Sequence, residues 1–113
     1  MIFQMTFFSD ALHEITLYTS GLKPLLVDDF RLLAEKGIQN LPVRYPGLKV
    51  ARYTVHPNRV EMILDFHRLD EDVLRVLQSF KLEVKNLAKK KGLQENHLWQ
   101  WNYEEKMLDS PPP

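Results

Sequence analysis

The sequence predicts a single α+β domain with the ferredoxin-like (RRM-like) split β-α-β arrangement, in which two helices cover one face of an antiparallel sheet. Two observations predict this class. Stretches with strand-like and helix-like patterns follow one another in the order strand, helix, strand, strand, helix, strand. The length of 113 residues suits one compact domain, which we expect to span residues 1–108 and to be followed by a disordered proline-rich tail at 109–113.

The amino-acid composition excludes several classes of functional site. Fifteen basic and fifteen acidic residues cancel, so any binding to DNA requires a local cationic patch rather than a positive field over the whole molecule. The absence of cysteine excludes disulfides, thiolate metal sites and a cysteine nucleophile. Because no apolar run approaches about 20 residues and the N-terminus carries no basic leader, we expect a cytoplasmic protein without membrane association.

The first half of the chain contains one predicted strand and one predicted helix. Residues 12–19 alternate between polar and apolar from Glu14 onward, as in a strand with one buried face. Residues 1–8 also favour strand, so an extra N-terminal strand is allowed, either in a hairpin or in one long bent strand. A helix is predicted from Asp28 to about Asn40, although Gly37 weakens its last turn. Its apolar positions are Phe30, Leu33, Ile38 and Leu41.

The second half predicts a hairpin, a long helix and a last strand. Residues 48–55 and 60–66 are the strands of the hairpin, and 56–59 are its turn. Residues 69–72 open the helix, and Gly92 follows three lysines at its end. The last strand is predicted at 97–103. The apolar stripe of the helix comprises Val73, Leu74, Leu77, Phe80, Val84 and Leu87.

The second strand of the hairpin carries two opposite charges one pleat apart. On a strand, Arg59 and Glu61 project from one face, while Val60, Met62 and Leu64 project from the other. An exposed ion pair would contribute roughly 0 to 1 kcal/mol, whereas a pair in a shared pocket would indicate function. His56 and His67 flank the hairpin, but no third ligand has suitable spacing, so we predict no metal site there.

Several segments resemble, in order, those of the single-tyrosine HUH transposases, which include insertion-sequence and repeat-associated tyrosine transposases. Pro57-Asn58 and the aliphatic residues after it resemble the family's signature strand, Pro-Asn-His-hydrophobe-His, with Arg59 and Glu61 at the two histidine positions. Leu98-Trp99-Gln100-Trp101-Asn102-Tyr103-Glu104 is similar to the family's Leu-Trp-Gln-x-x-Tyr strand. The resemblance covers residues 12–108 and includes Lys23-Pro24-Leu25-Leu26, Tyr45-Pro46-Gly47-Leu48-Lys49-Val50 and Gln78-Ser79-Phe80-Lys81.

The resemblance implies an ancestral chemistry that this sequence has lost. In the family, the two histidines bind a divalent metal and a tyrosine on a later helix attacks the scissile phosphate. Arg59 has no lone pair for a cation, and Glu61 alone is a poor chelate. The chain ends about ten residues past the Trp-Gln segment, and no tyrosine matches the nucleophile. We therefore expect a catalytically inactive derivative without a metal cofactor, which retains the fold and binds hairpin or single-stranded DNA weakly.

Two groups of residues are candidates for contacts with nucleic acid. The first is a cationic ridge on the long helix, formed by Arg75, Lys81, Lys85, Lys89, Lys90 and Lys91. It would either bind phosphates or be a solvated helix face whose C-terminal lysines are favoured by the helix dipole. Trp99, Trp101 and Tyr103 share one face of the predicted last strand, where they would stack bases or form core or a dimer interface.

Two other functions are compatible with the sequence. One is a homodimeric interaction module without a nucleic-acid role, since dimers are common in the family that the chain resembles. The other is a new enzyme built on Glu61 together with His56 or His67.

Overall fold

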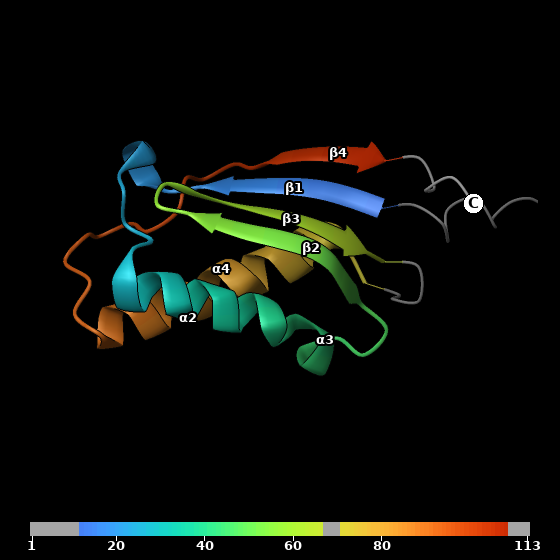
Figure 1. Cartoon of the computed structure of the whole chain (residues 1–113), viewed down its shortest axis with the longest axis horizontal. Coiled ribbons are helices and arrows are strands. Elements are labelled where there is room, and N and C mark those ends of the chain that lie inside the picture. Colours follow the sequence, from blue (N-terminus) through green and yellow to red (C-terminus); the bar gives the residue numbers. More distant parts are fainter. Residues whose placement is uncertain (1–11, 67–70, 109–113) are drawn as a thin grey trace, which may run out of the picture.

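One antiparallel sheet and two helices form the two layers of the structure, a computed structural model that describes residues 12–66 and 71–108. Within these ranges, the sheet has four strands in the order β2-β3-β1-β4, and both long helices lie on the same side of it (Figure 1). The predicted ferredoxin-like topology is therefore confirmed. The strands are β1 (Leu12–Tyr18), β2 (Lys49–His56), β3 (Arg59–Asp65) and β4 (Glu104–Leu108).

The two predicted helices are present as α2 and α4, and two short helical elements that were not predicted, η1 and α3, accompany them. They are η1 (Ser20–Leu22), α2 (Asp28–Gln39), α3 (Leu41–Arg44) and α4 (Val73–Lys90). The side chain of Asp72 caps α4 by accepting a hydrogen bond from the Leu74 amide. Gly92, just beyond the helix, has a φ of 105°, which only glycine adopts readily. The predicted strand at 1–8, the tail at 109–113 and His67 lie outside the described residues.

The hairpin is confirmed to within one residue at each strand. Pro57-Asn58 forms a two-residue link, and His56 pairs with Arg59. Thr19, at the end of β1, is fully buried and fixes the tip of the hairpin. Its amide donates to the Asn58 carbonyl at 3.0 Å, and its hydroxyl lies 2.7 Å from the Lys23 carbonyl oxygen. The bond to Asn58 holds the turn before β3 against the end of β1, and the bond to Lys23 fixes the chain that follows β1.

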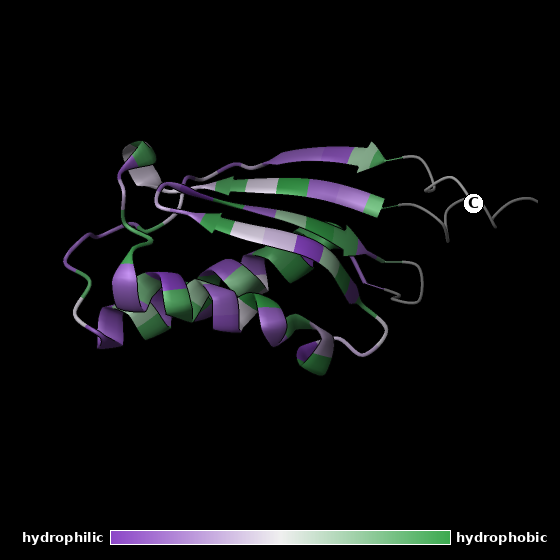
Figure 2. Ribbon diagram, in the orientation of Figure 1, coloured by the Kyte–Doolittle hydropathy of each residue, from purple (hydrophilic) through white to green (hydrophobic). Residues whose placement is uncertain are grey.

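Alternation along the strands separates a buried face from an open face. Ile15, Leu17, Val60, Met62 and Leu64 are almost fully buried under the helices. Figure 2 shows the corresponding alternation of hydrophobic and hydrophilic residues along β1. The opposite face of the sheet carries the polar residues that flank them in sequence, including Arg59 and Glu61. No helix in the two described ranges is long and apolar enough to span a membrane.

The close contact between α2 and α4 depends on a glycine. A Cβ atom at Gly37 would lie 3.0 Å from Val84 Cγ2 and 3.2 Å from Phe80 Cε1. The helix therefore continues through this position to Gln39, and the weakened last turn predicted from Gly37 is wrong. The missing side chain lets the two helices approach, and this outweighs the low helix propensity of glycine.

The prediction of a strand at 97–103 is also wrong. Only an isolated bridge between Thr19 and Trp99 occurs there, and the last strand is Glu104–Leu108, which pairs with β1. Trp99 is 9% exposed and packs near Phe80, whereas Trp101 is 95% exposed, so the two side chains do not share a face. The segment runs from the end of β1 along α4 before it joins the sheet.

Two members of the predicted apolar stripe on α4, Leu74 and Leu87, lie outside the core. Leu77, Phe80 and Val84 are fully buried, but Leu74 is 43% exposed. Leu74 lies in the first turn of the helix and faces a groove between α4 and the 97–103 segment. The predicted stripe was too wide at Leu74 because this residue on its edge lines the groove.

Candidate functional site

Arg59 and Glu61 form an ion pair on the open face of the sheet. Arg59 Nε donates to Glu61 Oε2 at 3.0 Å, and the other carboxylate oxygen, Oε1, lies 3.0 Å from His56 Nε2. Arg59 also donates to the Asn58 side-chain oxygen at 3.0 Å. The Arg59 and Glu61 side chains are 34% and 46% exposed. The two residues thus project from one face, and the pair is partly open to water.

The cluster stabilises the charged form of the carboxyl group. The hydrogen bond from Arg59, and then that from His56, holds the pKa of Glu61 below its ordinary value. Each carboxylate oxygen therefore already has a partner. A guanidinium at one of the two positions supplies only donors, so the residues present do not fit the pair of neutral metal ligands that the family resemblance implies at 59 and 61.

The open face next to this cluster is polar and slightly hollowed. Glu14, Thr16, Tyr18, Arg52, Thr54 and Glu104 are among the residues around a hollow of about 460 Å³. The Tyr18 hydroxyl donates to Glu104 Oε1 at 3.0 Å, and this bond raises the pKa of Tyr18. A tyrosine nucleophile needs the opposite shift or a base suited to its pKa. The bond to Glu104 thus favours the neutral hydroxyl of Tyr18, which lies beside the Arg59–Glu61 pair.

Groups that would hold a metal ion do not converge in the described part of the chain. Among residues 12–66 and 71–108, no three His, Asp or Glu side chains lie together as ligands would. His56 contacts Glu61, so the structure brings together one of the two pairs considered for a new enzyme. The other pair includes His67, which is not described.

The predicted cationic ridge divides into residues with different partners. Lys81 Nζ donates to the Gln100 carbonyl at 2.7 Å, and burial lowers the pKa of this ammonium. Arg75 Nε lies 3.8 Å from Glu71 Oε1, which partly neutralises it. No salt bridge or side-chain hydrogen bond from residues 12–66 or 71–108 engages Lys85, Lys89, Lys90 or Lys91.

Two of these four lysines, Lys85 and Lys89, are neighbours on one side of α4. They are four residues apart on α4, so they lie on one side of the helix about 6 Å apart along its axis. Lys90 and Lys91 follow at the C-terminal end, where cations are favoured by the helix dipole. We call Lys85 and Lys89 the lysine row.

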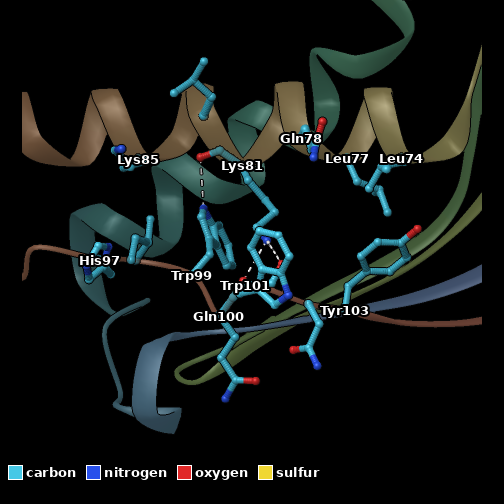
Figure 3. A pocket seen from close by; sticks show the side chains of 13 residues that line it. Leu74, Leu77, Gln78, Lys81, Lys85, His97, Trp99, Gln100, Trp101 and Tyr103 are labelled. Carbon is cyan, nitrogen blue, oxygen red and sulfur yellow. Dashed lines mark hydrogen bonds between the residues drawn. The ribbon is translucent and has the colours of Figure 1, made fainter.

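A groove lies between α4 and the segment 97–103 (Figure 3). Its volume is about 540 Å³, within the range of small-molecule sites. Leu74, Leu82, Lys85, Trp99, Trp101 and Tyr103 are among the residues that line it. The sequence patterns indicate the aromatic residues and the lysines separately, and they did not predict the groove. The available signal was Leu82, an apolar residue outside the predicted stripe that lies on the same side of the helix as Leu74 and Gln78, at intervals of four residues.

Comparison with solved structures finds transposases with the same fold. A REP-associated tyrosine transposase bound to a REP hairpin is similar with a TM-score of 0.73 and 12% identity over 98% of this chain. A candidate transposase from Deinococcus radiodurans R1 is similar with a TM-score of 0.73 and 13% identity over 96% of this chain. This chain spans 64% of the first structure and 82% of the second. No protein-family model and no curated protein matches the sequence.

Proposed function

We propose that this protein is a catalytically inactive relative of single-tyrosine transposases that binds hairpin or single-stranded DNA. The observation that carries the proposal is the Arg59–Glu61–His56 cluster, in which Arg59 and Glu61 stand at the two positions where the resemblance implies metal-binding histidines. The transposase-like fold supports the relationship, and the lysine row on α4 supplies unpaired cations for phosphates. One of the similar transposases is bound to a REP hairpin, which makes a hairpin the first DNA to test.

Inactivity is tested with single-stranded DNA in the presence of magnesium or manganese. We expect no nicking by the full chain, because Arg59 cannot ligate a cation and the pKa of Tyr18 is raised. Tyr18→Phe is the matched control, since Tyr18 is the tyrosine beside the Arg59–Glu61 pair. Nicking that requires the metal and disappears in Tyr18→Phe would overturn the proposed inactivity.

DNA binding is tested with labelled hairpin DNA over a series of salt concentrations. We expect weak binding at low salt that does not change on addition of EDTA, and that becomes weaker in Lys85→Gln and Lys89→Gln. Each lost phosphate contact reduces the slope of log K against log salt by about 1. Lys36→Gln, an exposed lysine on α2, is the matched control. Absence of binding at low salt would contradict this part of the proposal.

The homodimeric interaction module stays a prediction from the sequence, as does the cytoplasmic location. Light scattering over a range of protein concentrations separates the module from a monomeric DNA-binding protein. A strict monomer would contradict the module, whereas a dimer that binds neither hairpin nor single-stranded DNA would favour it.

A further inference from the structure

Trp101 presents an aromatic ring to solvent from one wall of the groove beside α4. Trp101 is 95% exposed, although the large apolar ring of tryptophan makes its exposure to water costly in free energy. Trp99, two residues earlier, is buried against α4, so the contrast arises within one short segment. An indole ring in this position contributes nothing evident to the core of the described structure.

The backbone that carries Trp101 is fixed on two sides. On the helix side, Trp99 Nε1 donates to the Lys81 carbonyl at 3.0 Å, and Lys81 Nζ donates to the Gln100 carbonyl at 2.7 Å. On the sheet side, the Gln100 amide donates to the Tyr18 carbonyl at 2.8 Å. Because the backbone of this wall is already fixed, a ligand that stacks on Trp101 would lose little binding free energy to ordering the main chain.

The opposite wall supplies apolar contacts and a cation. Leu74 and Leu82 line this wall and are 43% and 55% exposed. Lys85 also lines it, about one turn after Leu82 toward the C-terminal end of α4. No carboxylate lines the groove among the described residues. A matching ligand therefore has a flat, largely apolar ring and a nearby negative charge, as an unpaired nucleotide does.

We propose that this groove binds one unpaired nucleotide of a single DNA strand, with its base stacked on Trp101 and a neighbouring phosphate on Lys85. The inference rests on the proposed function and extends it from phosphate contacts to a contact with a base. Continuity favours a nucleotide over an apolar peptide, because Lys85 belongs both to the groove and to the lysine row on α4. The next phosphates along the strand would then meet Lys89.

Affinities of two fluorescent single strands of equal length test the proposal. One strand is oligothymidylate, and the other has the same backbone with abasic sites. Each is titrated against the full chain, Trp101→Ala and Trp101→Phe at low salt. Loss of one base–aromatic stack corresponds to roughly 5- to 150-fold weaker binding. We expect a loss in this range for oligothymidylate in Trp101→Ala, partial retention in Trp101→Phe, and no change for the abasic strand.

The outcomes separate this inference from the proposed function. Binding of both strands with no effect of Trp101→Ala would overturn the stacking contact alone, and it would favour another occupant of the groove such as an apolar peptide. An equal loss for both strands would also overturn it, because Trp101 would then not contact a base. If neither strand binds but hairpin DNA does, the inference falls and the proposed function stands. If neither the strands nor hairpin DNA bind, both fall. Val43→Ala, at a 73% exposed position on α3, is the control for loss of an exposed apolar side chain.

Discussion

Trp99 and Lys81 hold each other in place through groups on opposite sides of the groove. The Trp99 indole N–H donates to the main-chain carbonyl of Lys81, and the Lys81 ammonium donates to the carbonyl of Gln100, the residue after Trp99. The Trp99 ring also lies 5.9 Å from the Phe80 ring, centroid to centroid. Because of these contacts, the 97–103 segment packs along α4, although its sequence pattern is that of a strand.

Substitutions at the two tryptophans are expected to have very different effects on stability. Trp99→Ala removes a buried ring and should lower the free energy of unfolding by about 3 to 5 kcal/mol. Trp99→Phe keeps an aromatic ring but loses the donor to Lys81, for roughly 1 to 2 kcal/mol. Trp101→Ala, at a 95% exposed position, should change it by less than about 0.5 kcal/mol. Urea unfolding of the three variants measures these differences, and equal losses at Trp99 and Trp101 would contradict the structure.

The sequence predicted the order of elements well because that order depends on local patterns. Alternation in β1 and β3 and the helical spacing in α4 follow from burial of one face, so each could be recognised from its own residues. The 97–103 segment could not. Trp99, Trp101 and Tyr103 alternate as strand residues do, but Trp99 is bonded to a helix, and that partner is not visible in the local pattern. Glu104-Glu105-Lys106 consists entirely of charged residues and carries no strand signal, yet it pairs with β1.

Local sequence patterns also predict part of the candidate site. Period two alone places Arg59 and Glu61 on one face, and the structure agrees. The link from Glu61 to His56 depends on the two-residue turn at Pro57-Asn58, which places the two strand ends opposite each other. The engagement of Lys81 by main-chain carbonyls depends on the path of the distant 97–103 segment, so the sequence grouped Lys81 with the free lysines.

Gly37→Ala is expected to destabilise the protein, although alanine is the better helix former. The gain in helix propensity is about 1 kcal/mol, but the added methyl would lie 3.0 Å from Val84 Cγ2. Valine on a helix has a restricted side-chain torsion, so it cannot move aside easily. Overpacking of this kind costs about 1 to 3 kcal/mol, and we expect a net loss of roughly 1 kcal/mol in urea unfolding.

A second substitution tests the cause of that loss. In a Val84→Ala background, the 3.0 Å contact of the added methyl is absent and the 3.2 Å contact with Phe80 Cε1 remains, so the same change should cost less than in the unsubstituted chain. An additive double-mutant cycle would show that the loss does not come from this contact.

The contribution of Glu61 to stability should disappear on acidification. Because the folded-state pKa of Glu61 is lowered, its contribution is present above the unfolded-state pKa and is lost as pH falls through the folded-state pKa. Glu61→Gln should therefore lower stability at neutral pH, by no more than about 1 kcal/mol for a half-exposed pair. The difference from the unsubstituted chain should shrink below the usual range for a carboxyl group. Urea unfolding of both proteins at several pH values measures this, and a difference that grows in acid would contradict the assignment.

The pairing of β4 with β1 should depend more on Glu105 than on its neighbour Glu104. Glu105 Oε2 lies 2.5 Å from Nδ1 of His13, whose residue is only 9% exposed and whose ring packs edge-on against Phe66. Glu104 accepts a hydrogen bond from the exposed Tyr18 hydroxyl, which water can replace. Removing the partner of a mostly buried ring nitrogen costs about 1 to 3 kcal/mol, because water reaches that nitrogen poorly.

Hydrogen exchange of the β4 amides distinguishes these two carboxylates. In Glu105→Ala the β4 amides should exchange faster, by up to roughly 5- to 150-fold if the whole cost appears in local opening, while β3 amides keep their protection. Glu104→Ala is the matched control on the opposite face of the same strand, and it should change exchange much less. Both side chains are equally charged and adjacent in sequence, so net charge and strand propensity cannot explain a difference between the variants. Equal acceleration in both would mean that β4 is held by its backbone bonds to β1 rather than by His13.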